Sequence, residues 1–308
     1  MKENEIIALF QKQAGQLDDC ALLPSSASDT LVTTDTLVEG THFRPDWSSA
    51  EDIALKLIHV NISDLVASGA TAGSCLLSIG LPREHDEDFV RDFAKAFLVE
   101  CRSQGLSLLG GDTFRAPAII LGLTMWGSLH ADRNQPLLRS GGKAGDTLYL
   151  TGKVGLAALG FAILNGTAPT VPEALARSAL EKHRRPIARI GWGREISRHA
   201  SVSAMIDLSD GLASDAGRLA LASGLDLEIS LERVPCAGVD EYTVPVEMAV
   251  HSGEELELLF LASESPDLYF PCTAIGRAES GTGRVLWKRD GRSVQLAGSS
   301  FEHFGDGL

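Results

Sequence analysis

The stretch AEDIALKLIHVNISDLVASGATAGSCLLSIGL, residues 50–81, predicts a helix that is followed directly by a strand. The helical part is preceded by Ser48, which stands with Glu51 at the spacing of a capping box, and it stops at Gly69, a residue suited to a left-handed helix end. The second part, residues 74–81, is an apolar run of strand length. A helix that leads into a buried strand is typical of α/β proteins.

The same alternation continues on both sides of this stretch. LVTTD at residues 31–35 predicts a strand, residues 87–102 predict a helix, and the apolar run 118–129 predicts a further strand. We therefore expect an α/β fold of two domains. The chain has 308 residues, which is long enough for each domain to bury its own core.

The segment ADRNQPLLRSGGKAGD, residues 131–146, has the glycine, proline and charge content of a connection between domains. We place the boundary inside it, which predicts an N-terminal α/β domain over residues 1–138 and a C-terminal α/β domain over residues 139–308. DTLYLTG then begins a second α/β block. Its expected elements are helices at 155–165, 173–182 and 187–199 and a strand at 202–206.

Charge and hydropathy exclude several classes of protein. The formal net charge of −14 and the pI near 5.0 argue against binding of DNA or RNA, which needs clustered Lys and Arg side chains. The first residues, MKENEIIALFQKQ, lack the apolar core and cleavage site of a secretory signal. The longest apolar run, residues 118–129, falls short of the roughly 20 residues that span a bilayer. We therefore expect a cytoplasmic protein with neither nucleic acid nor membrane as a partner.

The five cysteines do not indicate a disulfide framework or a zinc site. They are odd in number, widely spaced and never in a C-x-x-C pair: Cys20, Cys75, Cys101, Cys236 and Cys272. We expect each to be a small buried apolar residue rather than a nucleophile.

Aspartates recur where predicted strands end and helices begin, and one lies inside the first long helix. They are Asp18, Asp19, Asp35, Asp64, Asp112, Asp207 and Asp210. Because the strand ends at one edge of an α/β sheet lie together, these carboxylates are expected to converge. A single aspartate after a strand is more often a turn former or a helix cap.

Two features near these aspartates favour a metal and phosphate site over ordinary turns. Thr33 and Thr34 add a pair of hydroxyl groups, and Gly110 and Gly111 allow the backbone to approach a bulky anion closely. Carboxylate and hydroxyl oxygens without His or Cys suit Mg²⁺, which usually bridges to the phosphates of a substrate. The group therefore predicts phosphoryl transfer.

The motifs of the common nucleotide-binding folds are absent from the sequence. It contains neither the Walker motif G-x-x-x-x-G-K-[ST] nor the protein-kinase set of G-x-G-x-x-G, H-R-D and D-F-G. A nucleotide site would have to be built in another way.

Eight segments, read together, resemble the thiamine-monophosphate kinase family. In the order of that family they are GQLDDCALL (15–23), VTTDTLVEGTHF (32–43), VNISDLVASGA (60–70), GGDTFRA (110–116), LLRSGGKAGD (137–146), IDLSDGLASD (206–215), SGEELELLF (252–260) and AIGRA (274–278). Several of them occur in looser form in the wider superfamily of ATP-using enzymes related to aminoimidazole ribonucleotide synthetase. The second and third segments are more particular to the thiamine enzyme.

The resemblance implies a fold, an assembly and a reaction. The fold is the two-domain PurM-like α/β architecture, and the assembly is a homodimer whose N-terminal domains share a β-barrel. The reaction is the phosphorylation of thiamine monophosphate to thiamine diphosphate, the last step in making that cofactor. It would use ATP as co-substrate, several Mg²⁺ ions and direct in-line transfer.

The resemblance also assigns site residues, none of them a covalent nucleophile. The metal ligands are Asp19, Thr33, Thr34, Asp35, Asp64, Asp112, Asp207 and Asp210; the ATP contacts are Gly111, Asp112, Arg139 and Ser209; the contacts to thiamine monophosphate are His42, Glu254 and Phe301. Outside the resemblance, His42 fits a surface loop equally well, and Phe301 fits ordinary core packing better.

Two segments depart from the usual pattern of the family. GQLDD stands where G-I-G-D-D is usual, and SGEELEL stands where G-G-E-D-Y-E-L is usual, so Leu17 replaces a glycine and Leu256 replaces an aromatic residue. Two other functions stay open. One is a different enzyme of the superfamily, such as a selenophosphate synthetase or the purine ring-closing enzyme, and the other is a non-catalytic dimer that senses nucleotide.

Overall fold

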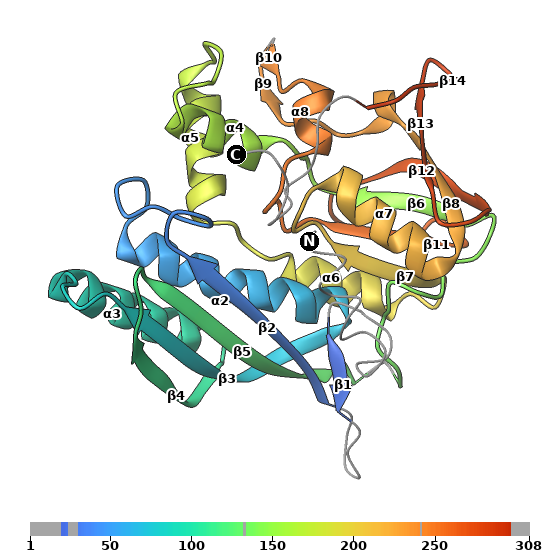
Figure 1. The fold of residues 1–308 in the computed structure, drawn as a ribbon. Helices are drawn as coiled ribbons and strands as arrows, with labels where there is room; N and C mark the ends of the chain where they lie inside the picture. The colour runs from blue at the N-terminus through green and yellow to red at the C-terminus, as the bar shows by residue number, and fades with distance from the viewer. Residues whose placement is uncertain (1–19, 24–29, 132–133, 241, 297–308) are drawn as a thin grey trace.

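The computed structural model describes residues 20–23, 30–131, 134–240 and 242–296, which form two large β-sheets and one two-stranded pair, with helices between and beside the large sheets (Figure 1). The expected α/β fold class is confirmed. One sheet is built from strands before residue 130 and the other from strands after residue 146. The boundary after residue 138 falls in the segment between them and stays a prediction.

The N-terminal sheet has the strand order β1-β2-β5-β3-β4. In that order the strands are Ala21–Leu23, Thr30–Val38, Ile120–Leu129, Ala70–Leu81 and Ser107–Arg115. Only β3 and β4 are parallel, and the helix between them, α3 (Glu87–Ser103), makes the crossover. It lies beside α2 (Ala50–Ala67) on one face of the sheet (Figure 1).

The C-terminal sheet has the strand order β14-β13-β8-β12-β6-β11-β7, with only β13 and β8 parallel. In that order the strands are Arg292–Ser293, Val285–Arg289, Leu225–Ser230, Cys272–Ser280, Thr147–Thr151, Leu258–Ala262 and Val202–Asp207. The helices are α4 (Leu156–Leu164), α5 (Glu173–Arg184), α6 (Ile190–Arg198), α7 (Leu212–Ser223), α8 (Val246–Val250) and the 3₁₀ turn η1 (Leu231–Arg233). The short strands β9 (Gly238–Val239) and β10 (Tyr242–Thr243) form a separate pair. The predicted helices after the boundary are thus present, with ends shifted by a few residues.

Helix α2 is capped by a different pair of residues from the one that the spacing suggested. Ser49 is the N-cap: its Oγ accepts from the Asp52 N–H at 3.2 Å, and its own N–H donates to Asp52 Oδ2 at 2.9 Å. Ser48 belongs to the preceding turn, where its N–H donates to the Arg44 carbonyl. The predicted stop is confirmed, since Gly69 has a φ of 75°.

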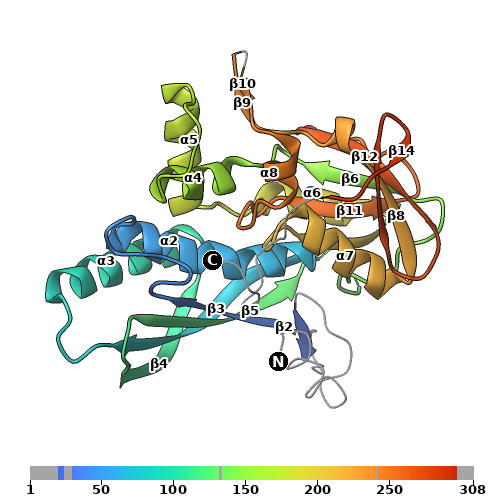
Figure 2. The same ribbon diagram turned by 45° about the horizontal axis from the view of Figure 1, so that its top comes forward.

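Helix α2 lies between the two sheets and packs on both (Figure 2). Strand β11 shows how the layers join: Leu258 and Phe260 belong to the core cluster that contains α2, whereas Leu259 and Leu261 belong to a second cluster on the opposite face of the same sheet. A strand buried on both faces reads as a continuous apolar run. The first core therefore passes from the N-terminal sheet through α2 into the C-terminal sheet. We had expected each domain to bury a core of its own, and this core is shared by both.

The other face of the N-terminal sheet packs against no helix within the described ranges. Its edge strand β4 is exposed along its whole length, and large apolar side chains on and beside it are exposed: Leu76 at 38%, Leu109 at 66% and Phe114 at 41%. At Gly111 of β4 a Cβ would lie 1.8 Å from the Leu77 carbonyl oxygen of β3, so the pairing of these strands requires glycine there. Strand pairing explains this glycine without an anion.

No helix in the parts of the chain that the structure describes is long and apolar enough to cross a membrane.

Candidate active site

Two hydrogen bonds from hydroxyl groups to carboxylates meet at adjacent residues of α2. Thr33 Oγ1 of β2 donates to Asp64 Oδ2 at 2.5 Å, and Ser63 Oγ donates to Asp207 Oδ2 at the end of β7 at 2.5 Å. Ser63 and Asp207 are buried, so the second bond is shielded from water. Of the expected group, the structure brings Thr33 into contact with Asp64, and it places Asp207 of the other half of the chain against Ser63, the neighbour of Asp64.

Strand β2 divides the predicted threonine pair between its two faces. Thr33 and Asp35 lie on the face that is buried against α2, because side chains alternate along a strand. Thr34 is exposed on the opposite face, where its hydroxyl donates to the Leu123 carbonyl at 3.2 Å and lies 3.0 Å from Thr124 Oγ1. The structure does not bring the Thr34 hydroxyl to Asp64. Asp35 was expected at a strand end, but it lies inside β2.

Asp112 lies on the open face of the N-terminal sheet. It was predicted to follow a strand, but it lies inside the edge strand β4, where it pairs in register with Ser78 of β3. Ser78 pairs with Gly122, and Gly122 pairs with Thr36 on the exposed face of β2. Partners in register point to the same side of a sheet. One copy of the chain therefore does not bring Asp112 to the carboxylates at α2.

The short loop between β7 and α7 is held by Asp215 of α7. Asp215 Oδ2 accepts from the N–H groups of Asp210 and Gly211, each at 3.0 Å. Arg218 pairs with Asp215 at 2.7 Å and with Asp210 as well. Burial, followed by the negative charge of Asp210, raises the pKa of Asp215. This network places Ser209 on the exposed tip of the loop.

Arg139, an expected ATP contact, lies beside the same network. Its carbonyl accepts from Ser223 Oγ of α7 at 2.8 Å, and its guanidinium is close enough to repel the charge of Arg218. Arg139 and Arg218 thus lie near the loop that carries the exposed Ser209, and arginines at such a loop suit the oxygens of a polyphosphate.

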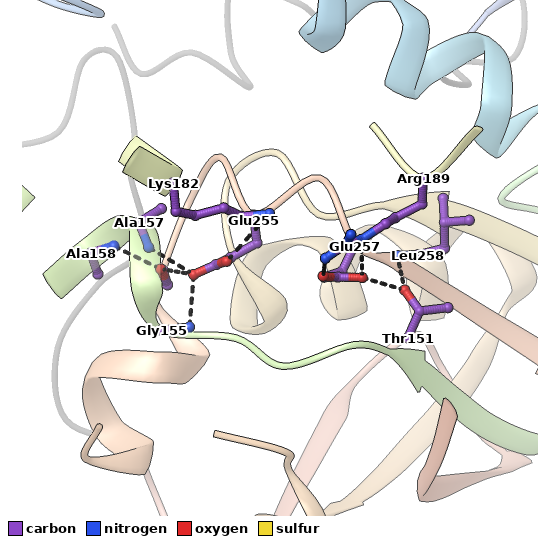
Figure 3. A network of polar contacts seen from close by, with 10 residues as sticks. Thr151, Gly155, Ala157, Ala158, Lys182, Arg189, Glu255, Glu257 and Leu258 are labelled. Atoms are coloured by element: carbon purple, nitrogen blue, oxygen red, sulfur yellow. Dashed lines mark hydrogen bonds and ion pairs between the residues drawn. The ribbon is translucent and has the colours of Figure 1, made fainter. Parts of the chain in front are cut away.

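Glu255 is one of two wholly buried glutamates in the loop between α8 and β11 (Figure 3). It accepts from the N–H groups of Gly155 at 2.7 Å and Ala157 at 3.1 Å, so it satisfies donors at the start of α4 that a helix leaves unpaired. Lys182 of α5 lies 4.0 Å away. Burial raises the pKa of Glu255 and lowers the pKa of Lys182.

Glu257, the other buried glutamate, is held by Arg189, the residue before α6 (Figure 3). Arg189 Nε donates to Glu257 Oε2 at 2.9 Å, and its terminal nitrogen pairs with the other oxygen. Thr151 Oγ1 of β6 also donates to Glu257, at 2.7 Å, and accepts from the Leu258 N–H at 2.9 Å. Both glutamates thus fix the loop SGEELE to the C-terminal sheet and its helices.

Glu254 stands in the same loop but turns to the other half of the chain. Lys56 Nζ of α2 donates to Glu254 Oε2 at 2.7 Å and to the His42 carbonyl at 2.9 Å. The structure therefore brings together His42 and Glu254, which the sequence assigned to one substrate. Sequence reasoning missed Lys56, although a lysine on a mostly apolar helix was a usable signal.

An aromatic group continues from this cluster. The Trp47 and Phe161 rings are 6.0 Å apart and edge-on, and His183 of α5 lies 5.9 Å from Phe161. Arg44 stacks over Trp47 at 4.6 Å. Aromatic faces near a carboxylate suit a flat cationic ligand. No local sequence pattern links these residues, so none of them was predicted as a site residue.

His183 predicts a dependence of stability on pH. Burial, followed by the positive charge of Lys56, lowers the pKa of His183 to about 4 in the folded protein. Between about pH 6.5 and pH 4 the unfolded chain binds this proton and the folded chain does not, so stability falls as the pH is lowered through this window. The loss from this group stays below about 3 kcal/mol because the side chain is partly exposed.

Urea unfolding of the wild type and of His183→Gln at pH 8, 6 and 5 checks this expectation. The variant should lose less stability than the wild type between pH 8 and pH 5. The comparison at pH 8, where His183 is neutral in both states, gives the packing cost of the substitution alone. An equal loss in the two proteins would contradict the assignment.

Two predicted site residues, Asp19 and Phe301, lie outside the described residues. Within the described ranges, no three His, Cys, Asp or Glu side chains are close enough together to hold a metal ion by themselves. The donor set around Asp64 is nevertheless made of carboxylate and hydroxyl oxygens. It fits Mg²⁺, which often takes only one or two carboxylates and completes its shell with phosphate oxygens and water.

Comparison with known families defines the class of protein. The family model described as "AIR synthase related protein, N-terminal domain" matches residues 17–129, and the one described as "AIR synthase related protein, C-terminal domain" matches residues 143–279. The fold and the matched domains thus define a two-domain AIR synthase related protein.

Full-length relatives narrow the class. The thiamine-monophosphate kinase of Leptospira interrogans (serovar Lai, strain 56601) is 38% identical over 309 residues, covering 99% of this chain and 98% of that protein. The thiamine-monophosphate kinase of Escherichia coli K12 is 35% identical, with 93% and 90% covered. A solved structure of AaThiL complexed with AMPPCP and TMP matches with a TM-score of 0.84 and 28% identity, covering 98% of this chain and 97% of that one. The chain belongs to the thiamine-monophosphate kinase family, as its motifs predicted.

Proposed function

We propose that this protein is a cytoplasmic thiamine-phosphate kinase that transfers the γ-phosphoryl group of ATP to thiamine monophosphate and releases thiamine diphosphate and ADP. The acceptor is an oxygen of a phosphate group, which is ionised at neutral pH. A strong general base is therefore unnecessary. What the protein must supply is the alignment of the two phosphates and the neutralisation of their charge.

The observation that carries the proposal is the meeting of the two halves of the chain at α2. Ser63 and Asp64 are neighbours on this helix, and they bind Asp207 of the C-terminal sheet and Thr33 of the N-terminal sheet. Two negative phosphates cannot be held beside these carboxylates without cations. Such a set therefore supports a metal-dependent phosphoryl transferase.

Mg²⁺ would supply the positive charge that neutralises the phosphates. The residues we propose for holding it are Asp19, Thr33, Thr34, Asp35, Asp64, Asp112, Asp207 and Asp210. Thr33, Asp64 and Asp207 have the support of the geometry at α2. Asp210 pairs with Arg218 in this structure, so its carboxylate would be shared between that arginine and a metal ion.

The remaining residues orient the two substrates. Arg139, Ser209 and Gly111 are proposed for ATP, and the loop between β7 and α7 supports the first two. His42 and Glu254 are proposed for thiamine monophosphate, together with Phe301. The carboxylate of Glu254 and the nearby aromatic rings complement the cationic thiazolium ring.

We also propose a homodimer formed through the open face of the N-terminal sheet. Exposed apolar side chains on this face, among them Leu76 and Phe114, are the kind of surface that a second subunit covers. A second copy that covers this face would also cover Asp112. Asp112 would then serve the site of the partner subunit, which accounts for its place on the face of the sheet opposite to α2 in one copy.

The test is an assay of ADP release with ATP, Mg²⁺ and each of three acceptors: thiamine monophosphate, free thiamine and the substrate of the purine ring-closing enzyme. We expect turnover with thiamine monophosphate and at most weak turnover with free thiamine. The cations of the site would be arranged around two phosphate-bearing substrates, and free thiamine carries no phosphate. Turnover with the purine precursor alone would indicate another enzyme of the superfamily. ATP binding without turnover of any acceptor would indicate a nucleotide sensor.

The transfer is expected to be direct, with no phosphorylated enzyme. The carboxylates of the site are committed to cations, and a carboxylate that binds a cation is a poor nucleophile. Incubation with Mg²⁺ and γ-labelled ATP, without thiamine monophosphate, should leave no label on the protein, and initial-rate plots should intersect. Stoichiometric label that is then chased into thiamine diphosphate would contradict direct transfer.

A further inference from the structure

Lys56 is a buried cation that joins the two described residues proposed for the thiamine end of the site. Its side chain is 3% exposed, and its Nζ donates to the His42 carbonyl at 2.9 Å and to Glu254 Oε2 at 2.7 Å. Lys56 and Glu254 are 198 positions apart in the chain. One ammonium group therefore spans the N-terminal and C-terminal halves at this point.

Packing alone does not explain this lysine. An ammonium group taken out of water costs free energy that its partners only partly return. An apolar residue at the same place on α2, between the buried Ile53 and Leu57, would avoid that cost. The contacts that Lys56 makes are therefore the reason to look for a function.

The backbone of Glu254 is fixed, and its carboxylate depends on Lys56. Glu254 has a φ of 58°, and its N–H donates to the Ser209 carbonyl at 2.7 Å. Ser252 and Glu255 on either side are wholly buried. The Glu254 side chain is itself 26% exposed, so it would be able to swing toward water if the ion pair to Lys56 were lost.

The second partner of Lys56 is the turn that carries His42. The Val38 N–H donates to His42 Nδ1 at 3.1 Å, which leaves the ring proton of a neutral His42 on Nε2. The His42 N–H in turn donates to the Val38 carbonyl at 2.9 Å. These bonds fix the ring relative to β2, and Lys56 fixes the turn relative to Glu254.

We propose that Lys56 is a positioning residue for the thiamine monophosphate end of the site, acting through Glu254 and the turn of His42. The inference rests on the proposed function. Because Lys56 holds Glu254 Oε2, it sets the direction of the other carboxylate oxygen toward the ligand. Its Nζ bonds go to Glu254 and His42, and it reaches Ser209 only through the backbone of Glu254, so we expect its larger effect on thiamine monophosphate.

The test is steady-state kinetics of Lys56→Met, Lys56→Arg and Glu254→Gln with each substrate varied in turn. Lys56→Met removes the charge and keeps most of the buried stem. We expect its KM for thiamine monophosphate to rise about tenfold or more while its KM for ATP changes less than about twofold. Lys56→Arg, which keeps the charge, should recover part of the loss. The double variant Lys56→Met with Glu254→Gln should be no worse than the more impaired single variant, because the two residues act as a unit.

Lys182→Met is the matched control. It makes the same change at a buried lysine that pairs with Glu255 in the same loop, and it should lower the thermal midpoint without separating the two KM values. Equal changes in both KM values for Lys56→Met, or none, would overturn the proposal. If Lys56→Met does not fold, Lys56→Arg and Glu254→Gln decide: an unchanged KM for thiamine monophosphate in both overturns it. If the wild type does not turn over thiamine monophosphate, the proposed function fails first and this inference falls with it.

Discussion

Replacing Asp64 by Asn is expected to lower kcat by at least about 100-fold while the protein stays folded. The amide keeps an oxygen that can accept from the Thr33 hydroxyl, so the contact between β2 and α2 survives. What is lost is the negative charge that holds cations beside the phosphates. Turnover at saturating Mg²⁺, together with the unfolding midpoint, checks the expectation.

Asp88→Asn is the matched control, because Asp88 is an exposed aspartate of α3 that pairs with Arg91 on the surface. It should leave kcat unchanged. Wild-type turnover in Asp64→Asn at saturating Mg²⁺ would remove Asp64 from the metal site.

Asp112→Asn should cause a similar loss, and mixing the two variants tests the proposed dimer. If Asp112 serves the partner subunit, a mixed dimer of the two variants has one site with both changes and one intact site. Re-association of the two inactive proteins should then restore part of the activity. No recovery after verified exchange of subunits would place Asp112 in the site of its own chain.

Glu257→Gln is expected to destabilise the fold by about 2–4 kcal/mol, the largest loss of stability we expect from any conservative change in the loop. Glu257 is wholly buried, and its charge is matched by Arg189. The amide leaves that guanidinium without its counter-ion and disturbs the bond from Thr151. Chemical unfolding measures the loss.

Glu247→Gln provides the comparison for Glu257→Gln. Glu247 pairs with Arg289 in the same Glu-to-Arg combination, but on the surface, with both side chains close to half exposed. Exposed ion pairs contribute less than about 1 kcal/mol. Equal losses in the two variants would show that burial does not decide the strength of the Glu257 pair.

Most of the secondary structure could be predicted from the sequence, because long helices and apolar strands leave periodic patterns. The stop of α2 at Gly69 is an example, since a left-handed terminator is a property of one residue. The cap was misplaced because Ser48 and Ser49 are both adequate, and the choice depends on how the preceding turn packs. Asp35 and Asp112 were assigned to strand ends because the predicted strands stop at these aspartates, whereas pairing with β5 and β3 carries both strands past them.

The site could be predicted only in part, because its geometry depends on contacts between distant segments. Asp64 and Asp207 were recognisable from motifs, and the structure bonds Thr33 to Asp64 and Ser63 to Asp207, while their role in holding a metal stays a prediction. Which face of the sheet Asp112 and Thr34 occupy is set by strand register, which no local motif encodes. Lys56 has a meaning only beside Glu254, and the chain between them is too long for any spacing rule.

The core shared through α2 has a consequence for how the chain folds. Leu258 and Phe260 of β11 pack in the same cluster as α2, so a fragment ending at residue 138 would expose the side of that helix that they cover. The two sequence domains are therefore one cooperative unit in this respect, and neither should melt while the other persists. A split gene that made the two halves as separate chains would have to let them bind each other, so that the C-terminal sheet still covers α2.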